Sequence, residues 1–472
     1  MSDMKETFRK YIEDHKDEML KDLFDLIRID SSADTSVEGK PYGIKPYTAF
    51  KAAMELCEKY GFSAESLENK VFLAEYEPGL PVELDMIAHV DVVPGGSGWT
   101  ETEPFDPVIK DGIIYGRGCS DDKGGMIALL YAMRALKESG VKLKKEARMI
   151  IGNSEETNMR DIHWYYDHYE EAPFTFTADA GFPVNNVEKG RLEAYFDADY
   201  VPASEPGTTE LIRFEGGNAP NQIPPYAFAL LKGVKCERVE EAAGKIAQET
   251  GVRLEVSEED GNVKIEAFGK SSHGARPHLG KNSVLALLKL VLEVSEKDSE
   301  LIAKLRKIYA YFPFGDFAAS YAGLAQENEI TGPTTCSLNM LKAADGHVRV
   351  SIDSRTAAEL DGRDLPAEME IIAKECGFTL FVKERTLSHI VPEDNPYVQI
   401  LLNCYSDVLG KPGRTSAIGG SSYVHSLKRG VVFGVTPDGF QPNAHGPNEQ
   451  IEVQALLDGV VIYAEAILKI CG

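Results

Sequence analysis

Cysteine is scarce in this sequence and follows no metal-binding spacing. The 472 residues include seven cysteines and no CxxC pair: Cys57, Cys119, Cys236, Cys336, Cys376, Cys404 and Cys471. An odd, scattered set argues against a disulfide framework and against a zinc site built from thiolates. The pattern favours a reducing compartment.

Basic residues and long apolar runs are also in short supply. Lys and Arg number 50 against 75 Asp and Glu, which gives a formal net charge of −25. This charge repels a phosphate backbone, so we expect no nucleic-acid partner. No apolar run is long enough to span a bilayer, and the charged segment 1–20 lacks the apolar centre of a secretory signal. We therefore expect a cytoplasmic protein with no membrane partner.

The rest of the composition is that of an ordinary globular protein. It is 26% charged and 43% hydrophobic, with 42 Gly and 24 Pro. These values exclude disorder, a collagen-like repeat and a coiled coil. At roughly 150 residues per domain, the length predicts two or three domains, enough for a large core and a cleft.

The first part of the chain has the pattern of an α/β domain. Helical spacing over 8–27 and 47–60 is followed by apolar strands. Four strand candidates precede segments that hold acids or histidines: 84–88, 149–151, 174–178 and 431–435. In open α/β sheets, binding groups gather in loops at the carboxyl ends of the strands. We therefore expect a binding site at that edge of a central mixed sheet flanked by helices.

From about residue 190 the pattern changes to alternating strands with hairpins. Turns are expected at Asp260-Gly261 and at Asp345-Gly346. Helical stretches at 239–250 and 367–376 suggest two related α+β units, although no sequence repeat is evident. The α/β pattern resumes after the prolines near 392–396. We predict a discontinuous α/β domain, 1–187 plus 386–472, with an inserted α+β domain, 188–385.

Candidate ligands stand at the ends of these strands. His89 and Asp91 leave the same face of an extended segment, so His89 could ligate a metal while Asp91 accepts the proton on the other ring nitrogen. Asp121 and Asp122 precede an apolar helix; a cap formed by either one is the simpler alternative, although two adjacent Asp residues exceed what one cap needs. Neither feature alone establishes a function, because both patterns also occur in purely structural settings.

Further acids follow the next strands. Glu155 and Glu156 are adjacent and would repel each other in a cleft unless a cation or proton intervened; a solvated turn is the alternative. Asp179 and the late His445 complete the set. Together His89, Asp121, Glu156, Asp179 and His445 form a nitrogen and oxygen set that suits two divalent zinc-like ions sharing a bridging carboxylate. Glu155 would then be free to accept a proton from water.

The ordered motifs AHVDVVP, IIYGRGCSDDKGG, NSEET, TADAGFPV, SSHGARPHLGKNS, SIDSR and HGPNE span nearly the whole chain. In this order they resemble the dinuclear zinc peptidases that include aminoacylase, carnosinase and bacterial dipeptidase V, and dipeptidase V above all. The resemblance implies a catalytic, metal-binding role for the discontinuous domain and the role of a lid for the inserted one. It makes Asp121 the bridging ligand and sorts the others by metal: His89 with Asp179, and Glu156 with His445.

The resemblance also implies a mechanism. Glu155 is the general base of an attack by a hydroxide that bridges the two metals, and Asp91 is the supporting acid. In the lid, His273 polarises the carbonyl oxygen, and Arg355 holds the substrate carboxylate, with an ordinary strand-end salt bridge as its alternative. Weaker similarity assigns substrate contacts to Asn221, Gly419 and Gly420.

Three features depart from the family pattern. An arginine is expected where His425 stands, Cys119 replaces a more usual small residue, and HGPNE replaces the commoner HQPNE. We predict a metal-dependent dipeptidase that hydrolyses small peptides with a free C-terminal carboxylate, as a monomer. Zinc is the favoured metal, with manganese or cobalt as alternatives. The competing hypotheses are a deacylase of N-acyl amino acids, of the acetylornithine or succinyl-diaminopimelate type, and a degenerate relative without turnover.

Overall fold

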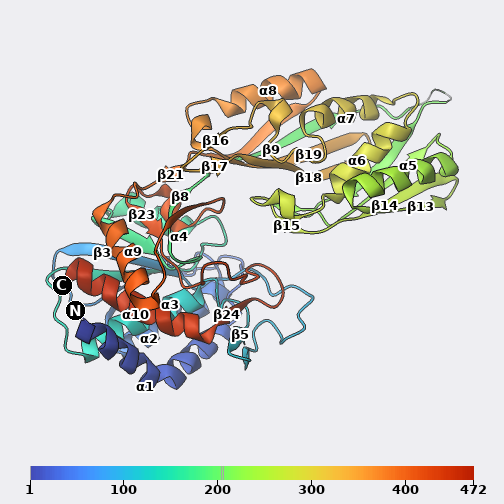
Figure 1. Cartoon of the computed structure of the whole chain (residues 1–472). Coiled ribbons are helices and arrows are strands. Elements are labelled where there is room, and N and C mark those ends of the chain that lie inside the picture. The colour runs from blue at the N-terminus through green and yellow to red at the C-terminus, as the bar shows by residue number, and fades with distance from the viewer. Residues whose placement is uncertain (1, 204, 206) are drawn as a thin grey trace. The chain divides into compact units, whose positions relative to one another are not determined.

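The computed structural model describes residues 2–203, 205 and 207–472, and the chain forms two compact units (Figure 1). Unit 1 consists of Met1–Val187 and His389–Gly472, and unit 2 of Glu188–Ser388. The second unit extends to Ser388 because β20 (Thr379–Thr386) pairs with β9 (Gly190–Asp199) of that unit. The chain therefore leaves unit 1 once and returns to it once.

Unit 1 is built on a nine-stranded mixed sheet, which confirms the predicted fold class. The strand order is β1-β2-β6-β3-β7-β23-β8-β21, with β22 paired to β8. The central strands β6, β3, β7 and β23 are parallel, whereas β1, β2 and β8 pair antiparallel with their neighbours. The strands are β1 (Ser63–Leu67), β2 (Val71–Glu75), β3 (Val82–His89), β6 (Glu146–Gly152), β7 (Phe174–Thr177), β8 (Val184–Glu188), β21 (His389–Ile390), β22 (Thr415–Ile418) and β23 (Gly430–Val432).

Helices cover both faces of this sheet, because its central strands are apolar on both sides. Met86 and Ala88 of β3 join the larger core with α1, α2, α3, α9 and α10, whereas Ile87 joins a smaller core with α4. Burial on both faces explains the near-continuous apolar runs of these strands. The helices are α1 (Ser2–Ile27), α2 (Ile44–Lys59), α3 (Lys123–Glu138), α4 (Arg160–His168), α9 (Pro396–Leu409) and α10 (Val453–Cys471). A small sheet adds β4 (Val108–Lys110), β5 (Ile113–Tyr115) and β24 (Gln450–Glu452).

Unit 2 is an antiparallel sheet of eight strands with a core of its own. The order is β13-β14-β12-β10-β18-β19-β9-β20, and helices α5 to α8 contribute to the core on one face. The two expected halves thus form one continuous sheet, joined where β10 pairs with β18. Its further elements are β10 (Glu210–Gly216), β12 (Tyr226–Lys232), α5 (Cys236–Thr250), β13 (Arg253–Glu259), β14 (Asn262–Phe268), α6 (Ser283–Val294), α7 (Glu300–Tyr311), β18 (Thr335–Ala344), β19 (His347–Thr356) and α8 (Leu365–Cys376). Two short strands, β11 (Gln222–Ile223) and β15 (Ser272–His273), pair with each other, as do β16 (Glu327–Asn328) and β17 (Gly332–Pro333).

The predicted hairpins of unit 2 are confirmed. Asp260 and Gly261 connect β13 to β14 with φ values of 51° and 76°, and Asp345 and Gly346 connect β18 to β19 with 53° and 82°. Two successive positive φ values characterise the tight turn that matches the twist of antiparallel strands. No helix in the described part of the chain has both the length and the apolar character needed to cross a bilayer.

Candidate metal centre

The five predicted metal ligands lie together at one edge of the unit 1 sheet. His89 ends β3, Glu156 follows β6, and Asp179 follows β7, and these three strands are parallel neighbours. Asp121 stands just before α3, and His445 lies between β23 and β24. The carboxyl ends of parallel strands meet at one edge of a sheet, so residues distant in the sequence become neighbours there.

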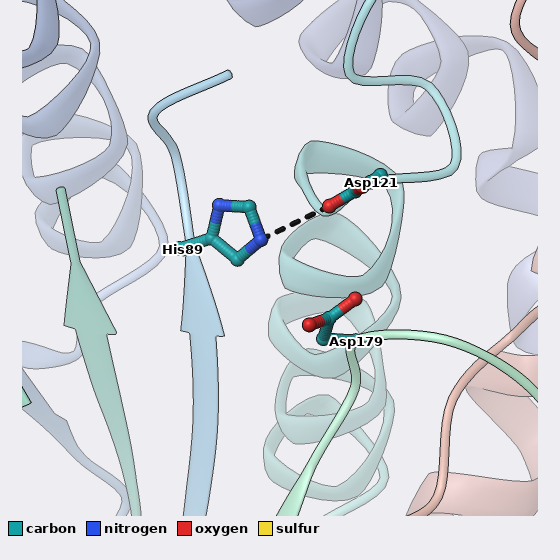
Figure 2. A group of neighbouring side chains, drawn as sticks. All are labelled: His89, Asp121 and Asp179. Atoms are coloured by element: carbon teal, nitrogen blue, oxygen red, sulfur yellow. Dashed lines mark ion pairs between the residues drawn. The ribbon is translucent and has the colours of Figure 1, made fainter. Parts of the chain in front are cut away.

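These ligands form two groups that share Asp121. One group is His89, Asp121 and Asp179, and the other is Asp121, Glu156 and His445; within each, the possible ligand atoms lie within 4.8 Å of one another. His89 Nε2 is 3.1 Å from Asp121 Oδ1, and His445 Nε2 is 3.0 Å from Asp121 Oδ2 and 3.1 Å from Glu156 Oε1. Figure 2 shows His89 pointing at Asp121, with Asp179 beside them. Asp121 thus offers a different oxygen to each group.

The orientation of His89 fits a cation at this position. The ring is fully buried, and Nδ1 donates a hydrogen bond to the main-chain carbonyl of Asp91 at 3.0 Å. In the neutral ring, the lone pair of Nε2 therefore faces the carboxylate of Asp121. Nε2 is buried and makes no hydrogen bond of normal geometry. Two electron-rich atoms face each other only when a proton or a metal ion lies between them.

The raised pKa values of several acids also indicate a site that suits a cation. Burial and the negative charge of Asp121 raise the pKa of Asp179 to about 7 and also raise that of Glu156. Burial raises the pKa of Glu155 well above its usual range, with Asp179 and Glu156 adding to the effect. Burial also acts to raise the pKa of Asp121, but its hydrogen bonds to His445 and His89 lower it overall. Such crowding of carboxylates calls for compensating positive charge, and the mixed nitrogen and oxygen donors suit divalent ions.

Asp91 connects two loops of the site. Its carboxylate accepts the backbone N–H of Glu155 at 3.2 Å and that of Glu156 at 3.1 Å. Its Oδ1 lies 3.5 Å from His89 Nδ1, farther than the main-chain oxygen that Nδ1 contacts. The expected contact between the Asp91 side chain and the imidazole is therefore secondary. The shorter contacts of this side chain hold the loop that carries Glu155 and Glu156.

Glu449 is a functional candidate that sequence reasoning missed. Its side chain is fully buried. Oε1 accepts the backbone N–H of Ser120 at 2.9 Å and of Asp121 at 3.1 Å, while Oε2 accepts the N–H of Gly118 at 2.9 Å and Nη1 of Arg117 at 2.8 Å. One carboxylate therefore shapes the turn that carries the shared ligand. Its position in the HGPNE motif, four residues after His445, was the available signal.

Asp161 plays a similar part for the loop after β6. Its Oδ2 accepts the backbone N–H groups of Asn153 and Ser154 at 2.6 and 2.7 Å, and the hydroxyl of Tyr423 at 2.7 Å. Burial and the charge of Asp91 raise the pKa of Asp161 to about 6. This carboxyl fixes the segment that leads into Glu155.

The helix-capping alternative for the paired aspartates does not match the structure. Asp122 is the N-cap residue of α3, yet its side chain makes no capping hydrogen bond. Instead, Oδ2 accepts the backbone N–H of His89 at 3.3 Å. A Cβ at Gly125 would lie 2.0 Å from Asp122 Oδ1, and one at Gly124 would lie 2.1 Å from the carbonyl oxygen of Cys119. The glycines after the aspartates therefore permit close packing beneath the site.

The remaining predicted residues are distributed between the units. Gly419 and Gly420 follow β22 in unit 1, whereas Asn221, His273 and Arg355 all lie in unit 2, in the β10–β11 connection, in β15 and in β19. Arg355 is buried and pairs with Asp353, its Nη2 lying 3.1 Å from Oδ2. The salt bridge considered as the alternative for Arg355 therefore exists.

Cys119 and His425, two of the three departures from the family pattern, both lie in unit 1. Cys119 is fully buried, and burial raises the pKa of its thiol well above the usual value, so it is a packed side chain and a poor thiolate ligand. His425 lies in a short 3₁₀ helix, Tyr423–Ser426, with its ring 6.3 Å from that of His389. Neither residue belongs to the two ligand groups.

Comparison with protein families identifies relatives over nearly the whole chain. The model described as "Peptidase family M20/M25/M40" matches residues 86–469. The chain is 31% identical over 458 residues to "Putative dipeptidase YtjP" of Bacillus subtilis (strain 168), covering 96% of this chain and 97% of that protein. It is also 31% identical over 474 residues to "Beta-Ala-Xaa dipeptidase" of Lactobacillus delbrueckii subsp. lactis, covering 98% of both.

Solved structures share the fold at lower identity. The di-peptidase Dug1p from Saccharomyces cerevisiae matches with a TM-score of 0.60 and 14% identity, covering 99% of each chain. The aminoacylhistidine dipeptidase from Vibrio alginolyticus matches with a TM-score of 0.57 and 13% identity, covering 96% of each. At these identities the likeness concerns the fold.

Proposed function

Because the chain belongs to peptidase family M20/M25/M40, we propose that this peptidase is a metal-dependent dipeptidase that cleaves dipeptides with a free C-terminal carboxylate. The family resemblance read from the motifs is thereby confirmed; the substrate is the proposal. Its support is the similarity to proteins named dipeptidase over 96% and 98% of the chain. The observation that carries the chemistry is the carboxylate of Asp121, which turns one oxygen to each of two histidines.

The proposed metal ligands are the five side chains of the two groups. Asp121 would bridge, with His89 and Asp179 on one ion and Glu156 and His445 on the other. Two divalent ions, when bound, would acidify a water molecule and polarise the scissile carbonyl. Zinc suits this mixture of imidazole and carboxylate donors, and manganese or cobalt are the alternatives.

Glu155 is the proposed general base. It stands beside the ligand Glu156 but belongs to neither ligand group, and Asp91 fixes its backbone. Burial raises the pKa of its carboxyl well above the usual range, and the negative charges of Asp179 and Glu156 add to the rise. It would accept the proton of the attacking water and return that proton to the leaving amine.

Unit 2 would act as a lid that supplies His273, Arg355 and Asn221 to the substrate, with unit 1 as the catalytic domain. The backbone N–H of Ala275 donates to His273 Nδ1 at 3.2 Å. In the neutral ring the proton therefore sits on Nε2, the form that donates a hydrogen bond to a developing oxyanion. We propose a monomer, because the long inserted unit would supply His273 to the site of its own chain; an obligate dimer in gel filtration would contradict this.

The experiment that tests this function compares substrates and a variant of the base. Purified protein with added zinc or manganese is assayed on a dipeptide library and on N-acyl amino acids, beside Glu155→Gln. We expect hydrolysis of dipeptides, a loss of about 100-fold or more in kcat for the variant, and unchanged metal content. Cleavage of acyl amino acids alone would favour the deacylase, and no turnover of either class would favour a degenerate relative.

A further inference from the structure

One face of the unit 2 sheet carries a row of charged side chains. In the ladder between β9 and β19, Arg355 stands opposite Arg191, and Asp353 stands opposite Glu193. Residues opposite each other in an antiparallel ladder share a face. Leu192, which stands between Arg191 and Glu193 on β9, belongs to the apolar core beneath the helices. The charged residues therefore occupy the face turned away from that core.

Asp353 links the two arginines of this row. Its Oδ1 accepts Nε of Arg191 at 2.9 Å, and its Oδ2 lies 3.2 Å from Nε and 3.1 Å from Nη2 of Arg355. Arg191 is itself held on its other nitrogens, with Nη1 2.6 Å from Glu384 and Nη2 2.6 Å from Glu193. Three carboxylates thus fix Arg191, and Arg191 in turn fixes Asp353.

The geometry of this pair leaves part of Arg355 for a second anion. A guanidinium can bind carboxylates along two edges, Nε with Nη2 and Nη1 with Nη2. Asp353 takes the first edge, so the second edge is not used by this partner. Burial lowers the pKa of Arg355, and the charge of Asp353 acts against that shift. Asp353 therefore both orients the guanidinium and supports its charge.

The neighbourhood of Asp353 also contains the other proposed substrate contacts of unit 2. A Cβ at Gly274 would lie 2.8 Å from Asp353 Oδ2 and 3.0 Å from the carbonyl oxygen of Asn221. The N–H of Gly274 donates to that carbonyl at 2.6 Å, and His273 directly precedes it. Asp353 thus lies against Gly274, whose backbone hydrogen bond connects the segment of His273 to that of Asn221.

We propose that Asp353, braced by Arg191, is a positioning residue that aims the guanidinium of Arg355 at the substrate carboxylate and so sets the preference for a free C-terminus. This inference rests on the proposed function. It adds two residues, Asp353 and Arg191, to those already assigned to substrate binding.

The test compares alanyl-alanine with its C-terminal amide as substrates of the metal-loaded full chain. In Asp353→Asn we expect KM for alanyl-alanine to rise about tenfold while kcat stays within about twofold, with little change for the amide. Arg191→Lys keeps the buried acid and weakens its brace, so it should shift KM in the same direction by a smaller factor. It also keeps the inference testable if Asp353→Asn fails to fold.

The matched control is Asp197→Asn. Asp197 lies on β9, the strand of Arg191, and pairs with Arg349 on β19 at 2.7 Å, so its replacement removes a more exposed ion pair of the same ladder away from Arg355 and should leave both substrates unaffected. Equal effects of Asp353→Asn on dipeptide and amide, or a fall in kcat at constant KM, would overturn the inference. A wild-type protein that does not discriminate between the two substrates would instead refute the carboxylate preference in the proposed function.

Discussion

Replacing Glu449 by Gln tests whether the turn around Asp121 is organised by a buried carboxylate. Gln has the same shape, but one of its two polar ends is an NH₂ group. Each carboxylate oxygen of Glu449 receives two N–H donors. Whichever way the amide points, two donors therefore face another donor, and Arg117, which is 2% exposed, loses its charged partner.

The magnitude follows from these contacts. A hydrogen bond to a charged group contributes about 1.5–3 kcal/mol, and removal of one partner of a buried ion pair costs about 3–5 kcal/mol. The hydrogen-bond value and the ion-pair value count some of the same contacts, so they are not added. We expect Glu449→Gln to lower the free energy of unfolding by about 4 kcal/mol. A native protein has roughly 5–15 kcal/mol in total, so the variant should fold but unfold earlier. Misplacement of Asp121 should weaken metal binding by about 10-fold to 100-fold.

Two measurements check this expectation: urea unfolding of the metal-free protein, and competition for zinc with a chromophoric chelator. Glu452→Gln is the matched control, because Glu452 is an exposed acid at the end of β24, the short strand that begins directly after Glu449. It should change neither quantity. Wild-type zinc affinity together with a wild-type urea midpoint in Glu449→Gln would refute the role assigned to this carboxylate.

Further predictions concern pH, metal and core packing. Burial and the charge of Asp91 raise the pKa of Asp161 from its ordinary 3.8 to about 6, so the folded protein holds this proton more tightly than the unfolded chain. The stability that this proton contributes to metal-free protein is complete below about pH 4 and is lost as pH rises through about 6, by up to about 3 kcal/mol. Urea unfolding of Asp161→Asn at a series of pH values should lack this loss. The same dependence of unfolding free energy on pH in both proteins would contradict the prediction. Chelation should lower the thermal unfolding midpoint because it removes the positive charge among the crowded acids, and added zinc should restore it; an unchanged midpoint would count against a metal centre. Phe176→Ala should cost about 3–5 kcal/mol in urea unfolding, since this fully buried ring stacks on Tyr463 and meets Phe433 edge-on; a loss below 1 kcal/mol would contradict that packing.

The candidate ligands could be anticipated because their signals are local. An apolar run that ends in His89, or that is followed by Glu156 or Asp179, predicts both the strand and the edge at which its acid emerges. The hairpins of unit 2 were equally local, since Asp-Gly pairs specify tight turns. The order of the strands was not predicted in detail, because pairing between β23 and β7 joins segments about 250 residues apart.

The backbone contacts through which buried acids hold the site together could not be identified in this way. Glu449 reaches the backbone of Asp121 across 328 positions of sequence, and Asp91 reaches that of Glu155 across 64. Their partners are backbone N–H groups, which every residue except proline carries, so no pattern of residue types predicts these contacts. The contacts of Arg191 with Asp353 are likewise visible only once β9 and β19 are paired.

Residue types and their spacing were thus sufficient to predict the α/β class and the family and to select the candidate ligands, since each depends on chemistry carried within a short segment. Folding alone decided which oxygen of Asp121 faces which histidine, and which buried carboxylates shape the loops around it. The reason is physical: direction and burial arise from the packing of distant segments, and these properties determine whether an acid binds a cation or accepts a hydrogen bond from the backbone.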